Sequence, residues 1–340
     1  MIRYAIVGAG RMGNAHANNL SCIENAQLAG VYDILPERSR ELAQKHNAAA
    51  CSSLDELLAL PNLDCLIVTT PTYAHAEAVQ AACQANIGIF CEKPLCRTQD
   101  DADRLLALLE GYQKLFAVGF VRRHMYKVIK AKQMLDANTL GRILYCNVDL
   151  PHGKYKRMPG DWFADFELCG GAILDMLAHH VDLCNWFFGQ PVNVYASSLL
   201  LDSKLPLPAD YVASIVNYDS GVICNLMSSW QRVGRSGEMM EIQGEKGTLI
   251  IDGTDLLTYY DQQGNLQKID PAAEFPAPKV AGHGVDNVNA ASGFFRQSLS
   301  LTSALAGEKL PLPGIKEAYD SLKVGLAMIE SSQTGKVVAF

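Results

Sequence analysis

The first thirty-three residues constrain the fold more than any other part of the chain. Residues 3–7, Arg-Tyr-Ala-Ile-Val, lead directly into the glycine-rich turn Gly8-Ala9-Gly10-Arg11-Met12-Gly13. Such a short apolar run is typical of an inner strand in a parallel sheet that is covered on both faces. Gly8 permits a tight turn, Gly10 lets the backbone approach a pyrophosphate, and Gly13 lets the next helix pack close to the strand. The turn therefore predicts a dinucleotide-binding loop.

Glycine-rich turns are common, so the surroundings of this one decide its interpretation. A strand precedes it, a helix is expected over residues 14–20, and a second apolar strand, residues 28–32, ends on Asp33. An acidic residue about 20 positions after the last glycine belongs to the same pattern. Together these features favour dinucleotide binding over the alternative, a purely structural βαβ turn.

Asp33 and its neighbour indicate which dinucleotide is bound. The carboxylate can accept hydrogen bonds from both ribose hydroxyls of NAD but would repel the 2′-phosphate of NADP. The next residue is Ile34 rather than an arginine, although Arg38 and Arg40 lie downstream and keep NADP as the less favoured alternative. We predict NAD as the cofactor, with contacts from Gly8, Gly10, Arg11, Met12, Gly13, Asp33 and Ile34.

Length and charge fit a two-domain cytoplasmic enzyme. The chain has 340 residues, more than one core usually organises, and 49% of them are hydrophobic. A net charge of -7 argues against a nucleic-acid surface. Residues 1–20 contain the first strand and the glycine loop rather than a signal peptide, and no apolar run reaches membrane-spanning length.

The 10 cysteines are scattered, without a CxxC pair or zinc-type spacing. We interpret them as buried thiols of a reducing compartment and predict no metal site.

Two further predicted strands end in polar loops. Strand 64–69 is followed by Thr70-Pro71-Thr72 and His75, and strand 88–91 is followed by Glu92-Lys93-Pro94. Open α/β sheets bind ligands at the carboxyl ends of their strands, so these loops are predicted to face the cofactor. The threonines have helix capping, and His75 a surface position, as simpler alternatives. Lysine at the mouth of a buried strand is costly unless it is paired or used, which favours a functional role for Lys93.

The chain changes character near Val121. Residues 1–121 read as a doubly wound Rossmann domain of the α/β class. Residues 122–340 read as an α+β domain, with helices near 125–136, 286–306 and 314–331 and an open, mainly antiparallel sheet. Because an open sheet face is a natural subunit contact, we predict a homodimer or homotetramer.

A polar group lies within residues 170–189 of this second domain. On a regular helix Asp175, His179 and Asp182 fall at positions i, i+4 and i+7, which places all three on one face. A carboxylate beside an imidazole suits acid–base chemistry, because it orients the ring and stabilises its protonated form. The alternative is a polar stripe that simply faces water.

These motifs, taken together, resemble the Gfo/Idh/MocA oxidoreductases along the whole chain. The motifs are Gly8-Ala9-Gly10-Arg11-Met12-Gly13, Thr70-Pro71-Thr72 with His75, Glu92-Lys93-Pro94, Gly119-Phe120-Val121-Arg122-Arg123, and Asp175 with His179 and Asp182. The sequence departs from many members in having Thr72 in place of Asn and Leu177 in place of Gly. The apolar Leu177 and the Gly-Phe-x-Arg-Arg stretch at residues 119–123 resemble the inositol dehydrogenase branch.

The resemblance implies a reaction and a set of residues. It implies that Lys93 and His179 are the catalytic pair, with Asp175 as a third catalytic residue that relays protons and binds a neighbouring hydroxyl of a cyclic polyol or sugar. Glu92 is expected beside the nicotinamide ribose or paired with Lys93. The wall of the substrate pocket is expected to include Arg122, Met176 and Trp230, with packing or a surface position as the alternative for each. Two other classes share the fold: a sensor that binds dinucleotide and sugar without turnover, and an NAD-dependent glycosidase.

Overall fold

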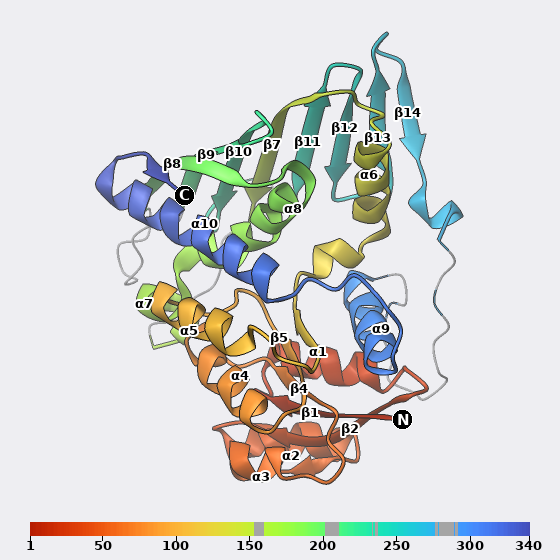
Figure 1. The fold of residues 1–340 in the computed structure, drawn as a ribbon, viewed down its shortest axis with the longest axis vertical. Coiled ribbons are helices and arrows are strands. Elements are labelled where there is room, and N and C mark those ends of the chain that lie inside the picture. The colour runs from red at the N-terminus through yellow and green to blue at the C-terminus, as the bar shows by residue number, and fades with distance from the viewer. Residues whose placement is uncertain are drawn as a thin grey trace. The chain divides into compact units, whose positions relative to one another are not determined.

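The computed structural model describes residues 1–152, 160–200, 211–232, 234, 237–275, 278, 289 and 292–340. The chain forms two compact units (Figure 1). The first comprises Met1–His124 with Ala277–Tyr319, and the second comprises Met125–Pro276 with Asp320–Phe340. Within the described residues, no helix is long and apolar enough to cross a membrane.

The first unit contains a six-stranded sheet in the order β3-β2-β1-β4-β5-β6, with every neighbouring pair parallel. Its strands are β1 (Ile2–Val7), β2 (Ala26–Tyr32), β3 (Ala49–Ala50), β4 (Cys65–Val68), β5 (Gly88–Cys91) and β6 (Phe116–Val118). Its helices include α1 (Arg11–Leu20), α2 (Pro36–Lys45), α3 (Leu54–Leu58), α4 (His75–Gln84) and α5 (Gln99–Leu109). The predicted Rossmann architecture is confirmed. The strand order reverses at β1, so β1 and β4 together mark the edge where such sheets bind ligands.

A later segment, α9 (Gly293–Leu305), also belongs to the first unit. The buried Tyr4 hydroxyl of β1 lies 2.8 Å from Thr302 Oγ1, and Leu301 packs in the core beneath the sheet. This division differs from the single boundary near Val121 that the sequence indicated, because α9 lies far from β1 in sequence but shares its core. The expected start of this helix, at residue 286, lies outside the described residues.

The second unit is built on a nine-stranded sheet in the order β14-β13-β12-β11-β7-β10-β9-β8-β15. Only the β7–β10 pair is parallel among the pairs described, so the predicted mainly antiparallel sheet is confirmed. The strands are β7 (Ile143–Pro151), β8 (Pro191–Leu199), β9 (Tyr211–Tyr218), β10 (Ile223–Ser229), β11 (Met239–Gly244), β12 (Gly247–Asp252), β13 (Leu257–Asp261), β14 (Leu266–Ile269) and β15 (Val338–Ala339).

Helices cover one face of this sheet. They include α6 (Tyr126–Asp136), α7 (Phe166–Cys169), α8 (Ala178–Phe188) and α10 (Ile315–Thr334), whose first residues belong to the other unit. In Figure 1, α8 and α10 lie over the sheet, and the Ser331 hydroxyl of α10 accepts a hydrogen bond from the Ala196 amide of β8 at 2.8 Å. Along β9, Val212, Ser214 and Val216 are buried, whereas Ala213 and Ile215 are exposed. This alternation is typical of a sheet with one covered and one open face.

Candidate active site

The glycine loop has the geometry of a dinucleotide-binding turn. Gly8 has a φ of +95°, and a Cβ there would lie 2.6 Å from the backbone of Thr69. A Cβ on Gly13 would lie 2.2 Å from the Gly8 oxygen, so α1 can begin this close to β1 only with glycine. A Cβ on Gly10 would meet nothing within 4 Å, which leaves room at the N-terminus of α1. That room, beside backbone amides with positive dipole character, fits the pyrophosphate of NAD.

Two polar side chains that the sequence analysis missed hold this loop in place. Asn14 Nδ2 donates to the carbonyl oxygens of Ala9 at 3.0 Å and Gly10 at 2.9 Å. Thr69 Oγ1, at the end of β4, donates to the Gly8 oxygen at 2.6 Å. An asparagine one residue after the last glycine is the signal that would have identified the first of these contacts.

Asp33 is fixed beside the loop by two backbone amides. Its Oδ2 accepts from Ala9 N at 2.7 Å, and its Oδ1 accepts from Leu35 N at 2.9 Å. Each carboxylate oxygen keeps a second lone pair, and a pair of free acceptors is what two ribose hydroxyls require. Ile34 is 75% exposed, Arg11 is exposed and Met12 is half-buried, so the loop offers both charge and apolar surface at this edge.

The loop after β4 places its polar groups inside the unit. Thr72 is buried in a single 3-10 turn (η1, Thr72–Ala74) that follows Pro71, and neither η1 nor α4 has a side-chain cap. Capping therefore does not account for Thr70 or Thr72. The Thr70 hydroxyl is buried and has no hydrogen-bond partner among the described residues, which fits a group that a bound ligand satisfies.

His75 is buried rather than on the surface, contrary to the simpler of its two interpretations. Its Nδ1 lies 2.9 Å from the Pro94 oxygen and its Nε2 lies 3.0 Å from the Thr70 oxygen. The ring thus links the loops that follow β4 and β5. Burial lowers the pKa of His75, although both carbonyls act in the opposite direction. Its contacts in this unit are structural: they set the spacing of the two loops.

Glu92 forms a buried pair with His16 of α1, a residue that the sequence analysis did not single out. Glu92 Oε1 lies 2.8 Å from His16 Nε2, and both side chains are buried. Glu92 Oε2 accepts from the Lys93 amide at 3.2 Å, and a Cβ on Gly119 would lie 2.8 Å from this oxygen. Burial raises the pKa of Glu92, but the hydrogen bond and charge of His16, with the charges of Lys93 and His75, outweigh it and hold this pKa below its ordinary value. The pair therefore ties the end of β5 to α1.

Lys93 is half-buried and directly follows this pair. The Lys93–Pro94 peptide bond is cis. Lys93 follows the carboxyl end of β5, in the loop whose Pro94 oxygen lies 2.9 Å from His75 Nδ1. Arg122, expected in the pocket wall, is half-buried in a 3-10 turn (η2, Val121–His124) after β6.

The polar group of the second unit lies on an irregular helix. Ile173–Leu177 form a π-helical turn (η4), which runs directly into α8. Asp175 and Met176 lie on this turn and His179 lies in the first turn of α8; all three are half-buried. A π turn replaces i→i+4 by i→i+5 hydrogen bonds, and such turns occur frequently at functional sites.

Asp182, in α8, is 1% exposed, whereas Asp175 and His179 are half-buried. The common face of the three side chains stays a prediction, because a π turn changes the spacing between Asp175 and the residues that follow it. Trp230 is also fully buried, with its ring centroid 5.7 Å from that of Phe163, so packing accounts for it.

Family models match segments of both units. Residues 2–120 match the model of the oxidoreductase family with an NAD-binding Rossmann fold, and residues 128–250 match the GFO/IDH/MocA C-terminal domain. Myo-inositol 2-dehydrogenase of Thermotoga maritima is 30% identical over 274 residues, 78% of this chain and 80% of the relative. Inositol 2-dehydrogenase of Rhizobium meliloti is 26% identical over 253 residues, 73% of this chain and 74% of the relative.

The fold has a solved counterpart in a levoglucosan dehydrogenase in complex with NADH and levoglucosan. The TM-score is 0.88, with 19% identity and 99% of each chain covered. Sequence motifs, fold and comparisons therefore agree, and the chain belongs to the Gfo/Idh/MocA family of NAD-binding oxidoreductases.

Proposed function

We propose that this enzyme transfers a hydride between a secondary hydroxyl of a cyclic polyol or sugar, of the inositol type, and NAD. The observation that carries the proposal is the half-buried Asp175 and His179 on and after the π turn, in a chain whose first unit fixes Asp33 for ribose recognition. Relatives that act on inositols support the substrate class.

Each polar residue has a role in the proposed reaction. NAD, when bound, supplies the hydride acceptor. His179 removes the proton of the reacting hydroxyl, and Lys93 donates a hydrogen bond to the same oxygen and stabilises its developing negative charge. Asp175 binds a neighbouring hydroxyl and orients the imidazole. The buried Glu92–His16 pair keeps Lys93 in place, because Glu92 accepts a hydrogen bond from the Lys93 amide.

We infer a preference for NAD over NADP from Asp33. Both of its oxygens are held by backbone amides, so the carboxylate cannot turn away from an added 2′-phosphate. Arg38 and Arg40 are exposed on α2, and a 2′-phosphate held by either arginine is the alternative. The residues of the loop that would hold the cofactor are Gly8, Gly10, Arg11, Met12, Gly13, Asp33 and Ile34.

We also propose that the enzyme is a homodimer, or a dimer of dimers, joined through the open sheet face. Tyr195 and Ile215 are register partners on β8 and β9, and they are 43% and 46% exposed. Adjacent apolar side chains on an unpaired sheet face are suited to an isologous contact, in which the same patch occurs on both subunits.

The test is a panel of inositols and pyranoses, each incubated with enzyme and NAD and followed by NADH absorbance and by product analysis. The proposal expects NADH in a one-to-one ratio with the oxidised product. Sugar release without net NADH would identify the glycosidase chemistry instead. Tight NADH and sugar binding without any turnover would identify the sensor.

A further inference from the structure

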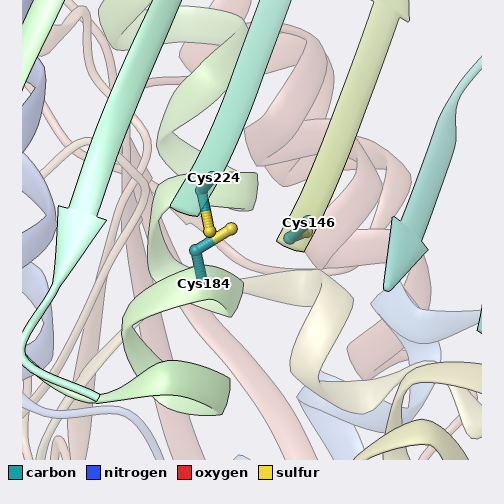
Figure 2. Close-up of side chains that lie close together, drawn as sticks. All are labelled: Cys146, Cys184 and Cys224. Carbon is teal, nitrogen blue, oxygen red and sulfur yellow. The ribbon is translucent and has the colours of Figure 1, made fainter. Parts of the chain in front are cut away.

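Three cysteines that are scattered in the sequence meet in the core of the second unit. Cys146 lies on β7, Cys224 on β10 and Cys184 on α8, and all three are fully buried. Cys146 and Cys224 are register partners in the parallel β7–β10 pair, so both point to the same face of the sheet. Figure 2 shows Cys184 reaching from the helix toward Cys224, with Cys146 on the neighbouring strand.

The three sulfur atoms lie within 4.8 Å of one another. Three sulfurs bound to one ion at about 2.3 Å would be separated by about 4 Å, so little side-chain adjustment is needed. No other group of three His, Cys, Asp or Glu side chains in the described part of the chain is placed this closely. The geometry points to a binding site for one soft, thiophilic metal ion of low coordination number, with Cu(I) as the ion that fits best; this is our proposal.

Ligand number and type favour Cu(I) over zinc. Structural zinc takes four ligands, whereas the set of described side chains here consists of three thiols. The neighbouring Tyr218 hydroxyl already donates a hydrogen bond to Asn185 Oδ1 at 2.9 Å. Thiols are also the ligands that select Cu(I) among the available metals.

Cysteine binds a metal ion as the thiolate, so each thiol that binds Cu(I) releases its proton to solvent. Binding of Cu(I) is therefore expected to strengthen as pH rises.

The experiment titrates the reduced, folded protein with Cu(I), added anaerobically as its acetonitrile complex, against a Cu(I)-specific chelator as competitor. We expect one equivalent of Cu(I) to be withdrawn from the chelator, with thiolate-to-copper absorption in the near ultraviolet. Cys184→Ala and Cys224→Ala should weaken binding by about 100-fold or more, because loss of a group that merely supports a metal ligand already costs about 10- to 100-fold.

The matched control is Cys65→Ala, which removes a fully buried thiol from the sheet of the first unit and should leave the single equivalent unchanged. Circular dichroism establishes that each variant is folded, and Cys184→Val, which fills a similar volume, replaces Cys184→Ala if that variant unfolds. The proposal is overturned if the wild-type protein withdraws no Cu(I) at equilibrium, or if Cys65→Ala and the cluster variants bind alike.

Discussion

The loop edge of the first unit and the η4–α8 segment of the second unit hold their functional side chains in different ways. At the loop edge, carboxylates are anchored: Asp33 by two backbone amides and Glu92 by His16 and the Lys93 amide. In the second unit, Asp175 and His179 are half-buried around a π turn, and local helix geometry decides where they point. The first arrangement suits a dinucleotide of fixed shape. The second depends on a π turn, whose backbone hydrogen bonds differ from those of a regular helix.

The largest effects on kcat are expected at Lys93 and His179, the two residues proposed to act on the reacting oxygen. Lys93→Met and His179→Ala should each lower kcat by about 10² to 10⁴, the usual worth of an acid–base or charge-stabilising group. NADH affinity should change by no more than a few-fold in either variant, because neither side chain anchors the loop. Steady-state rates on the best substrate of the panel, with fluorescence titration of NADH, check both statements.

His180→Ala is the control for His179→Ala, because it removes the neighbouring buried imidazole. A thermal melt of each variant distinguishes a loss of folding from a loss of catalysis. Near wild-type turnover in His179→Ala would show that this residue is not the base.

Disruption of the buried Glu92–His16 pair in the first unit is expected to lower the free energy of unfolding. His16→Ala leaves the Glu92 carboxylate buried without its imidazole partner, and breaking a buried pair in this way typically costs about 3 to 5 kcal/mol. Urea denaturation should show this loss in the free energy of unfolding, together with a lower kcat because Lys93 is less well placed. His46→Ala, at the end of α2, should cost less than about 1 kcal/mol as the matched control.

The same pair has a pH signature. The pKa of Glu92 is lowered in the fold, so its contribution to stability is present above the unfolded pKa of about 4.3 and is lost as pH falls through the lower folded value. His16→Ala should therefore cost least at the acid end of this window. A cost that does not change with pH would contradict an ionised Glu92.

The loop edge of the first unit could be predicted from the sequence far better than the η4–α8 segment of the second unit. The glycine loop and Asp33 follow from local rules, since a positive φ or a close backbone approach admits only glycine. The partner of Glu92 is 76 residues away on α1, and such distant pairing leaves no local pattern. The π turn at Ile173–Leu177 leaves no mark in the spacing of polar residues, and α9 joins the first unit through core packing with β1. The cysteine cluster likewise depends on strand register.

A smaller effect is expected for cofactor choice. Wild-type enzyme should bind NADH more tightly than NADPH by about 1 to 3 kcal/mol, the scale of a lost set of charge-assisted hydrogen bonds. Asp33→Ala should remove most of that preference without unfolding the protein. If Arg38→Ala or Arg40→Ala selectively weakens NADPH, an arginine holds the 2′-phosphate and the preference is set elsewhere; equal wild-type affinities would contradict the role of Asp33.

The smallest effect on catalysis is expected at the open sheet face. Ile215→Lys places a charge in the proposed subunit contact and should convert the oligomer to a monomer at micromolar concentration in light scattering, with kcat within a few-fold of wild type. Lys268→Ala, on β14, removes a side chain far along the sheet from β9 and serves as the control. A monomeric wild-type enzyme would contradict the proposal.

The most direct test of the central claim, that Lys93 and His179 act on one oxygen, is kcat of the double variant. Groups that work as a unit are strongly non-additive, because removing either already abolishes the shared function. The Lys93→Met/His179→Ala enzyme should therefore be little slower than the slower single variant, with NADH binding retained. A double variant whose loss equals the product of the two single losses would show that the residues act independently and would contradict the account.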